Sequence, residues 1–304
     1  MLIGAVFGLI TAVTLGVNNL LTAVVARRFG VLRSTTVTLT IAFVVMIAWA
    51  LVIGVPYQIT RDQVILLGLL GAAAATSFLG SYMALRLGPV SVVSPISALS
   101  GAITVLYSYW LLAERPTAVQ WIGIPIAAAG AVLASLVIEK GAKIRLVTWG
   151  PVFAMIAVLV GSLSNAGLKI PIRDGLDSNW TIITQRFYTV AYVALVFVII
   201  ARITLNKERE GKESRLEDWD RRQSKITWRN GWLLGLVGVI DAISFVTFGY
   251  GLAYAPAWLI GLLSQSGRVI AVIGGVIFFH ERLHHLQWTG VGLVAVGLVM
   301  SIAG

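Results

Sequence analysis

Few side chains of this 304-residue chain could do chemistry, because it contains no cysteine, only three histidines and 13 acidic residues. Asp241 is the only acidic residue deep within a long apolar stretch. A charge in the middle of a bilayer costs about 2.5–3.5 kcal/mol or more, so a residue in that position is a candidate functional group. Asp241 is therefore the first residue for which we seek a partner and a role.

Counting residues suggests such a partner. Arg268 lies about as far after the helix break near residues 254–255 as Asp241 lies before it. Antiparallel helices that rise 1.5 Å per residue would bring the two to about the same depth. We predict an Asp241–Arg268 ion pair, which would either fix two helices together or bind substrate or a proton inside a cavity.

Arg186 and several uncharged polar residues are further candidates. Arg186 lies about two turns inside its apolar stretch, from which it could serve a site or extend to the membrane interface. Asn18 and Asn19 lie far along the first stretch, and Asn165 occupies the position equivalent to Asn19 in the second half of the chain. These amides could face each other across a cavity or simply bond helices together. Weaker candidates for the same cavity are Tyr82, Ser94, Tyr250, Ser264 and Gln265.

One motif suggests an enzyme. Residues His280 to His284 match the H-E-x-x-H pattern of zinc proteases. Such a site normally needs a third ligand, and no Asp, Glu or His follows His285. We therefore expect no metal, no cofactor and no enzymatic activity, and keep an intramembrane metalloprotease as a remote alternative.

The composition places these residues in a membrane protein. The chain is 58% hydrophobic and only 12% charged, with a mean hydropathy of +0.90. A soluble domain would carry about twice that share of charge. Although the net charge is +10, nine of the 23 Lys and Arg residues lie in the single segment 202–229, so we expect no nucleic-acid partner.

Ten apolar stretches are long enough to cross a bilayer as helices, which takes about 20 residues each. They cover residues 2–26, 34–55, 63–87, 89–112, 118–138, 147–169, 179–203, 230–253, 255–279 and 285–303. The connections that follow the odd-numbered stretches hold 17 Lys and Arg residues, and those that follow the even-numbered stretches hold four. The positive-inside tendency then places both termini outside the cell.

An internal repeat divides the chain into two halves. A shift of 167 residues aligns 77–130 with 244–297 without a gap, and 14 of 54 positions are identical. The block Glu-Arg-x4-Gln-Trp-x-Gly occurs at 114–123 and again at 281–290. We predict two five-helix repeats, 1–138 and 147–304, joined by a connector at 139–146, with a polar loop at 204–229. Because five is odd, the repeats must be inverted, as they are in many secondary transporters.

These features resemble the EamA-type transporters of the drug/metabolite transporter superfamily. The resemblance rests on the repeated Glu-Arg and Gln-x-x-Gly block and on the segment Leu87 to Ile96, and it covers nearly the whole chain. It implies a transporter of small organic solutes, more often an exporter, with a cavity lined by helices from both halves. It also implies that both termini lie in the cytoplasm, whereas the count of basic residues places them outside the cell. In addition, it supports a shared role for Arg186.

The sequence therefore predicts an all-α, multi-pass protein of the cytoplasmic membrane with ten transmembrane helices. We expect a monomeric secondary transporter whose partners are a small solute, the lipid bilayer and, if transport is coupled, protons. The main alternative is a magnesium transporter of the same superfamily, which should need several carboxylates. Substrate, direction and coupling ion stay open.

Overall fold

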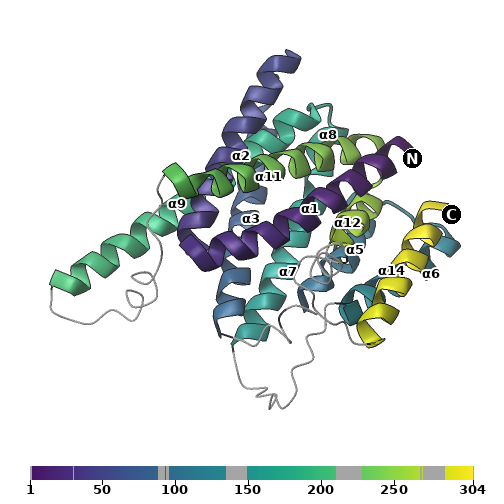
Figure 1. The fold of residues 1–304 in the computed structure, drawn as a ribbon. Helices are drawn as coiled ribbons and strands as arrows, with labels where there is room; N and C mark the ends of the chain where they lie inside the picture. Colours follow the sequence, from purple (N-terminus) through teal and green to yellow (C-terminus); the bar gives the residue numbers. More distant parts are fainter. Residues whose placement is uncertain are drawn as a thin grey trace.

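The computed structural model describes residues 2–29, 31–87, 93, 96–134, 149–209, 228–267, 269 and 285–303, and all regular structure within them is helical. Figure 1 shows these helices gathered into one bundle, with the first residues of α1 and the last residues of α14 on the same side of it. The helices are α1 (Leu2–Phe29), α2 (Val31–Ile53), α3 (Arg61–Leu87), α5 (Ser100–Leu112), α6 (Ala118–Ala134), α7 (Gly150–Gly167), α8 (Lys169–Arg173), α9 (Ser178–Arg209), α11 (Trp228–Tyr254), α12 (Ala257–Gln265) and α14 (His285–Ala303).

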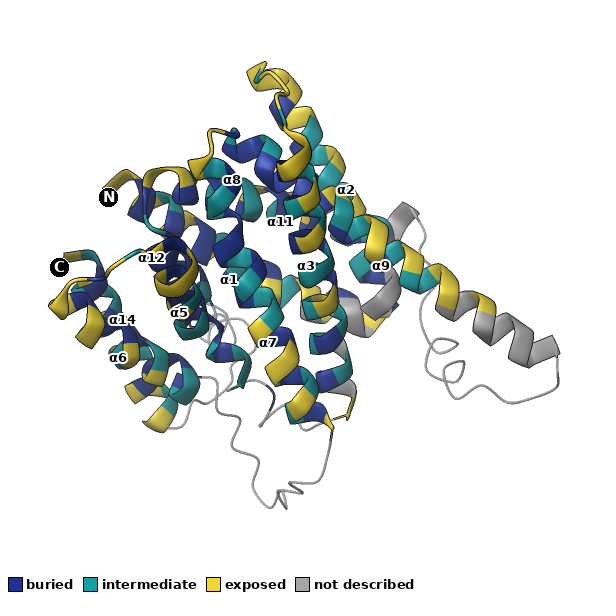
Figure 2. Ribbon diagram, turned by 180° about the vertical axis from the view of Figure 1, so that it is seen from behind, coloured by how far each residue is buried: buried dark blue, intermediate teal, exposed yellow. Residues whose placement is uncertain are grey.

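The helices have the length and the surface of a membrane protein. Seven of those described are long and apolar enough to cross a bilayer, and two shorter apolar helices cover Ile96–Leu112 and Ala118–Ala134. Large apolar side chains lie on the outside of the bundle, among them Val52 and Trp110, which are 81% and 78% exposed. Figure 2 shows exposed residues along the outer faces of the helices. Lipid rather than water suits such a surface. The count of ten stays a prediction, because residues 88–92, 94–95 and 270–284 lie outside the described part.

Polar side chains mark where helices begin. At the start of α3, the Thr60 amide donates to Gln63 Oε1 at 3.0 Å, and the Gln63 amide donates to Thr60 Oγ1 at 3.4 Å. Thr117 and Gln120 form the same reciprocal capping box before α6. Gln120 belongs to the repeated sequence block, so part of that repeat serves to begin a helix.

Glycines let α6 and α14 pack backbone to backbone at one edge of the bundle (Figure 1). A Cβ atom added to Gly297 would lie 2.4 Å from the Ala127 nitrogen, and one added to Gly130 would lie 2.6 Å from the Val294 nitrogen. Neither helix could approach so closely with a larger residue at these positions. This pair contacts the other helices much less than it contacts itself.

Helix α12 lies at the centre of the core. Eight of its nine residues are buried, and it packs mainly against α5 and α1. Leu259, Ile260 and Leu263 have no exposed surface, and Leu252 of α11 packs in the same cluster. Residues buried so completely fix the position of α12 and of the polar residues at its far end.

The predicted boundaries agree with the helices within a few residues for most stretches. Two differ in a physically clear way. The stretch 147–169 forms α7 up to Gly167, and after a turn at Leu168 a separate short helix, α8, begins at Lys169 and continues to Arg173. Helix α9 continues to Arg209, so the beginning of the predicted polar loop 204–229 is helical and extends beyond the bundle (Figure 1).

Candidate functional site

A cavity of about 210 Å³ lies among five helices, α1, α3, α7, α11 and α12. The described residues that line it combine amides and hydroxyls with phenyl rings and one carboxylate. The lining residues are Thr11, Leu15, Asn18, Asn19, Phe78, Asn165, Asp241, Ser244, Phe245, Phe248, Ser264 and Gln265.

Helical periodicity explains why these residues share one cavity. The four lining residues of α11 are at 241, 244, 245 and 248, and those of α1 are at 11, 15, 18 and 19. Positions three, four and seven residues apart fall on one face of an α-helix. Each helix therefore presents a mixed polar and aromatic face inward while its remaining faces contact neighbours or lipid.

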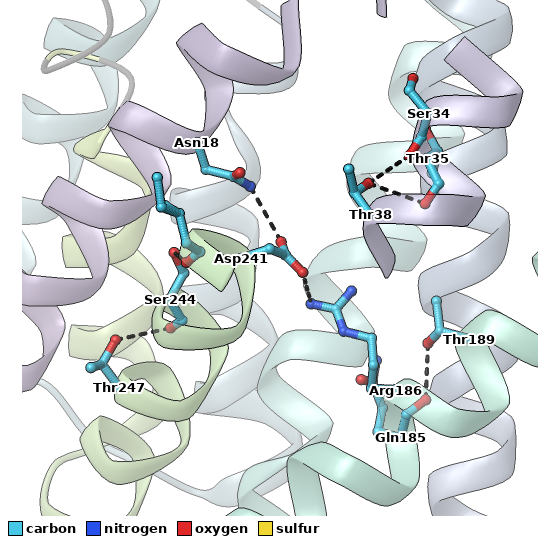
Figure 3. Close-up of polar contacts among 11 residues, drawn as sticks. Asn18, Ser34, Thr35, Thr38, Gln185, Arg186, Thr189, Asp241, Ser244 and Thr247 are labelled. Carbon is cyan, nitrogen blue, oxygen red and sulfur yellow. Dashed lines mark hydrogen bonds and ion pairs between the residues drawn. The ribbon is translucent and has the colours of Figure 1, made fainter. Parts of the chain in front are cut away.

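Asp241 accepts hydrogen bonds from two other helices. Arg186 Nη2, from α9, lies 2.8 Å from Asp241 Oδ2 and forms an ion pair with it. Asn18 Nδ2, from α1, donates to Asp241 Oδ1 at 3.3 Å. Figure 3 shows both side chains pointing at the carboxylate from opposite sides. Three helices are thus joined through one acidic residue.

Arg186 is buried and does not extend to the membrane interface, so that alternative for it is wrong. Its side chain is 1% exposed, and its guanidinium carbon lies 3.8 Å from the centre of the Phe245 ring. The ring face offers a second favourable contact to the cation. The predicted Asp241–Arg268 pair cannot be compared directly, since Arg268 lies outside the described residues, but Asp241 has Arg186 as a cationic partner.

Three buried polar atoms around this ion pair have no hydrogen-bond partner within the described part of the chain: Asn18 Oδ1, Gln185 Oε1 and Arg186 Nε. Asn18 is one of the cavity-lining residues. A buried acceptor without a partner is costly, and a bound molecule with a donor group would relieve that cost. Asn18 Oδ1 is therefore a candidate contact for a solute.

Six of the eleven residues predicted for the cavity line it: Asn18, Asn19, Asn165, Asp241, Ser264 and Gln265. In particular, the amides predicted to face each other from the two halves, Asn19 and Asn165, share the cavity. Arg186 is not itself a lining residue and reaches the cavity through Asp241. Ser94 and Arg268, and the side chain of Tyr82, lie outside the described residues.

Tyr250 is not among the lining residues, which corrects its predicted place. Its ring stacks on Phe7 with centroids 5.3 Å apart, and its hydroxyl accepts a hydrogen bond from Asn179 Nδ2 at 3.1 Å. The reason is geometric. Tyr250 follows Asp241 by nine residues, about two and a half helical turns, so the two side chains leave α11 on opposite faces.

Sequence reasoning missed several lining residues, notably the aromatic ones. Phe78 and Phe245 are identical residues at equivalent positions of the 167-residue repeat, and both line the cavity. Thr11, Ser244 and Phe248 were missed as well. The signal that could have found Phe78 and Phe245 is the repeat itself, because equivalent positions of two symmetric halves can face one central space.

The zinc-protease pattern at 280–284 lies outside the described residues. Within the described part, no group of three or more His, Cys, Asp or Glu side chains could hold a metal ion.

Nearly the whole chain matches a family of transporters. A model of the EamA-like transporter family matches residues 2–136 and 148–303. Protein RarD from Streptomyces exfoliatus is 35% identical over 68 residues, which are 22% of either chain. An uncharacterized transporter encoded in the cobO 3' region of Sinorhizobium sp. is 32% identical over 78 residues, which are 26% of this chain and 55% of that protein. The matches thus span only part of these curated relatives. A solved structure described only as "Crystal structure of protein" has the same fold, with a TM-score of 0.75 and 19% identity over 99% of this chain and 97% of that one.

Proposed function

Because the chain belongs to the EamA-like transporter family, we propose that it is a secondary transporter that carries a small organic solute through the cavity described above. Two inverted five-helix halves, 1–138 and 147–304, would expose this cavity alternately to the two sides of the membrane. The observation that best supports this proposal is the cavity itself. Amides, hydroxyls and a carboxylate gather there inside otherwise apolar helices, where polar groups are costly unless they serve a pathway.

The size of the cavity favours a small solute. Its volume of about 210 Å³ is below the roughly 300–1,000 Å³ of pockets that hold drug-sized ligands. An amino acid or a small amine fits this volume better than a bulky drug or a nucleotide sugar.

The charges favour a solute that is neutral or zwitterionic. Among the described lining residues the only carboxylate is Asp241, which is already paired with Arg186, so these residues offer no net charge to an ion. Asn18 Oδ1 can accept from an ammonium or hydroxyl group of the solute. Phe78, Phe245 and Phe248 supply apolar and π surface for a hydrophobic side chain. A hydrated magnesium ion would need more carboxylates than this lining contains.

We propose export across the cytoplasmic membrane, on family grounds, by a monomer. Asp241 is the proposed proton acceptor if transport is coupled to protons, because it is the only acidic residue deep inside an apolar stretch. An imposed proton gradient should then drive accumulation of the solute against its own gradient.

Counterflow in proteoliposomes tests this function. Vesicles loaded with members of one chemical class (amino acids, amines, sugar phosphates or cationic drugs) should accumulate the labelled solute of that class only. Asn165→Leu removes a lining amide at similar volume and should slow exchange about tenfold, the worth of one good hydrogen bond. Val299→Leu, on a side chain that is 65% exposed to lipid, is the matched control. No exchange of any class, or equal exchange by both variants, would contradict the proposal.

A further inference from the structure

The turn between α11 and α12 is bound by two charged side chains from other elements. Glu114, in the connection between α5 and α6, accepts hydrogen bonds from the backbone amides of Ala257 and Trp258, at 3.0 and 3.3 Å. Lys169, the first residue of α8, donates to the carbonyl oxygens of Leu252 and Ala255. One carboxylate therefore binds the free amides at the start of α12, and one ammonium group binds the free carbonyls at the end of α11.

The sequence of the turn explains why outside partners are needed. The N-cap position of α12 is Pro256, which has no side-chain acceptor, and no side-chain hydrogen bond caps the helix from within. The first amides of a helix have no intrahelical partner and carry a partial positive charge. The Glu114 carboxylate suits both properties. In the predicted division of the chain, Glu114 belongs to the first half and α12 to the second, so this contact joins the halves.

The turn closes one end of the bundle. A Cβ atom added to Gly4, near the start of α1, would lie 2.4 Å from the Ala255 Cβ atom. The first four residues of α12 are at most 2% exposed. Ser264 and Gln265, the cavity-lining residues of α12, lie seven to eight residues beyond Ala257, which is about 10–12 Å along the helix. A packed layer thus separates the cavity from this end.

A third charge supports the same contact. Arg173 of α8 donates from Nη1 to the Leu112 carbonyl oxygen at 2.9 Å, at the end of α5. The positive charges of both Lys169 and Arg173 act on the Glu114 carboxylate. The connection from α5 to α6, helix α8 and the α11–α12 turn are thereby joined at one end of the bundle by three charged residues.

We propose that Glu114 and Lys169 are positioning residues that form a latch on the α11–α12 turn, and that the latch keeps the cavity closed at this end until transport requires it to open. The proposal rests on the proposed alternating access. Neither residue contacts the cavity. Glu114 acts through α12, whose start it holds against the first half, and Lys169, from the same half as α12, holds the end of α11 beside it. The Glu114 contact must break before α12 can move away from α1 and α5.

The absence of cysteine from the chain makes the latch directly testable. A single cysteine in place of the lining residue, Ser264→Cys, reports access to the cavity through its rate of reaction with a membrane-impermeant maleimide in sealed vesicles. A single cysteine introduced as Asp62→Cys marks the vesicle face on which the latch lies. Asp62 is exposed in the first turn of α3. The Val55 carbonyl, a few residues earlier in the chain, accepts a hydrogen bond from Trp180 near the start of α9. The start of α3 therefore lies at the end of the bundle where α9 begins.

Added to Ser264→Cys, Glu114→Leu keeps the bulk of the side chain but has no acceptor. It should raise the rate of labelling from the latch face by at least about tenfold. Glu114→Gln keeps one acceptor and should give an intermediate rate. Lys169→Met removes the other contact and should act in the same direction, which keeps the test usable if Glu114→Leu does not fold. Asp62→Asn, an exposed acid on the same face, should leave the rate unchanged.

The latch is overturned if neither Glu114→Leu nor Lys169→Met changes the rate at which the cysteine of Ser264→Cys is labelled from the latch face, although that cysteine reacts from each face of the membrane in turn. Alternating access would then still stand. If the reporter reacts from only one face in every variant, alternating access fails and the latch fails with it. Because labelling needs no known solute, both results are independent of the identity of the substrate.

Discussion

Removing the Asp241 carboxylate should destabilise the protein through the cation that it leaves behind. Asp241→Asn keeps the shape of the side chain but leaves Arg186 buried, 1% exposed, without an anion. Breaking one partner of a buried ion pair costs about 3–5 kcal/mol, most of it from the uncompensated charge. The Phe245 ring at 3.8 Å from the guanidinium can offset only part of this cost.

A second substitution separates stability from function. When Arg186→Met is added to Asp241→Asn, no buried charge is left, and replacing a buried pair by uncharged residues is often neutral or stabilising. The double variant should therefore recover most of the lost stability. Transport should stay lost if Asp241 serves the cavity, since the carboxylate that accepts from Asn18 is still absent.

Unfolding in mixed micelles with a denaturing detergent measures the free energies, and counterflow in vesicles measures transport by the same variants. Asp62→Asn is the control for loss of an exposed acid and should change stability by less than about 0.5 kcal/mol. The reasoning is refuted if Asp241→Asn costs less than about 1 kcal/mol, well below the cost of breaking a buried pair, or if the double variant is no more stable than the single one. A double variant that transports normally would show that the ion pair has a structural role only.

Three further predictions concern the helix edges and the latch. Gly297→Ala should destabilise by about 1–3 kcal/mol by forcing α6 and α14 apart, whereas Gly292→Ala, on the same helix with nothing within 4 Å of the new Cβ, should stabilise by up to about 1 kcal/mol; equal melting temperatures would refute this. Burial raises the pKa of Glu114 above its ordinary value of 4.5, although two amides and the nearby cations act against the shift. The folded protein therefore holds the Glu114 proton more tightly than the unfolded chain does. This contribution to the stability of the folded state is complete below pH 4.5 and is lost as pH rises through the raised pKa. Over that range, the melting temperature of the protein relative to that of Glu114→Gln should fall and not rise. Glu281 stands where the repeat places the equivalent of Glu114, so Glu281→Leu should speed labelling of the cavity cysteine from the opposite face; faster labelling from the latch face instead would contradict the symmetry.

The extents of the helices and part of the cavity could be predicted from the sequence because they depend on local quantities. Length and hydropathy determine which stretches can cross a bilayer, and the repeat pairs Asn19 with Asn165 before any contact is known. The same repeat pairs Phe78 with Phe245, and both line the cavity. Both pairs of equivalent residues thus line one cavity.

The partner of Asp241 depends on which helices pack together, and a sequence does not contain that information directly. Counting residues along α11 and the following helix matched backbone depths and pointed to Arg268. Arg186 lies on α9 and reaches Asp241 through its long side chain. Counting residues along the chain does not show that a third helix, α9, brings Arg186 to Asp241, and the sequence does not show which face of α11 carries Tyr250 inside the fold.

The role of the repeated Glu-Arg block also required the fold. The sequence shows that the block recurs, but only the packing shows that Glu114 binds the amides of a helix more than 140 positions later in the chain. Gln120 and Gly123 of the same block serve a cap at the start of α6 and a close approach to α14. Three residues of one motif thus stabilise three different contacts.

Ligand-dependent thermal stability of the detergent-purified protein tests most directly whether the cavity binds a small solute. A ligand present at 100 times its dissociation constant should add about 2.7 kcal/mol to the stability of the folded protein. We predict that one class among amino acids, amines, sugar phosphates and cationic drugs raises the melting temperature, and that Asn165→Leu reduces the rise while Val299→Leu does not. No stabilisation by any class, or the same rise in both variants, would contradict a solute site in this cavity.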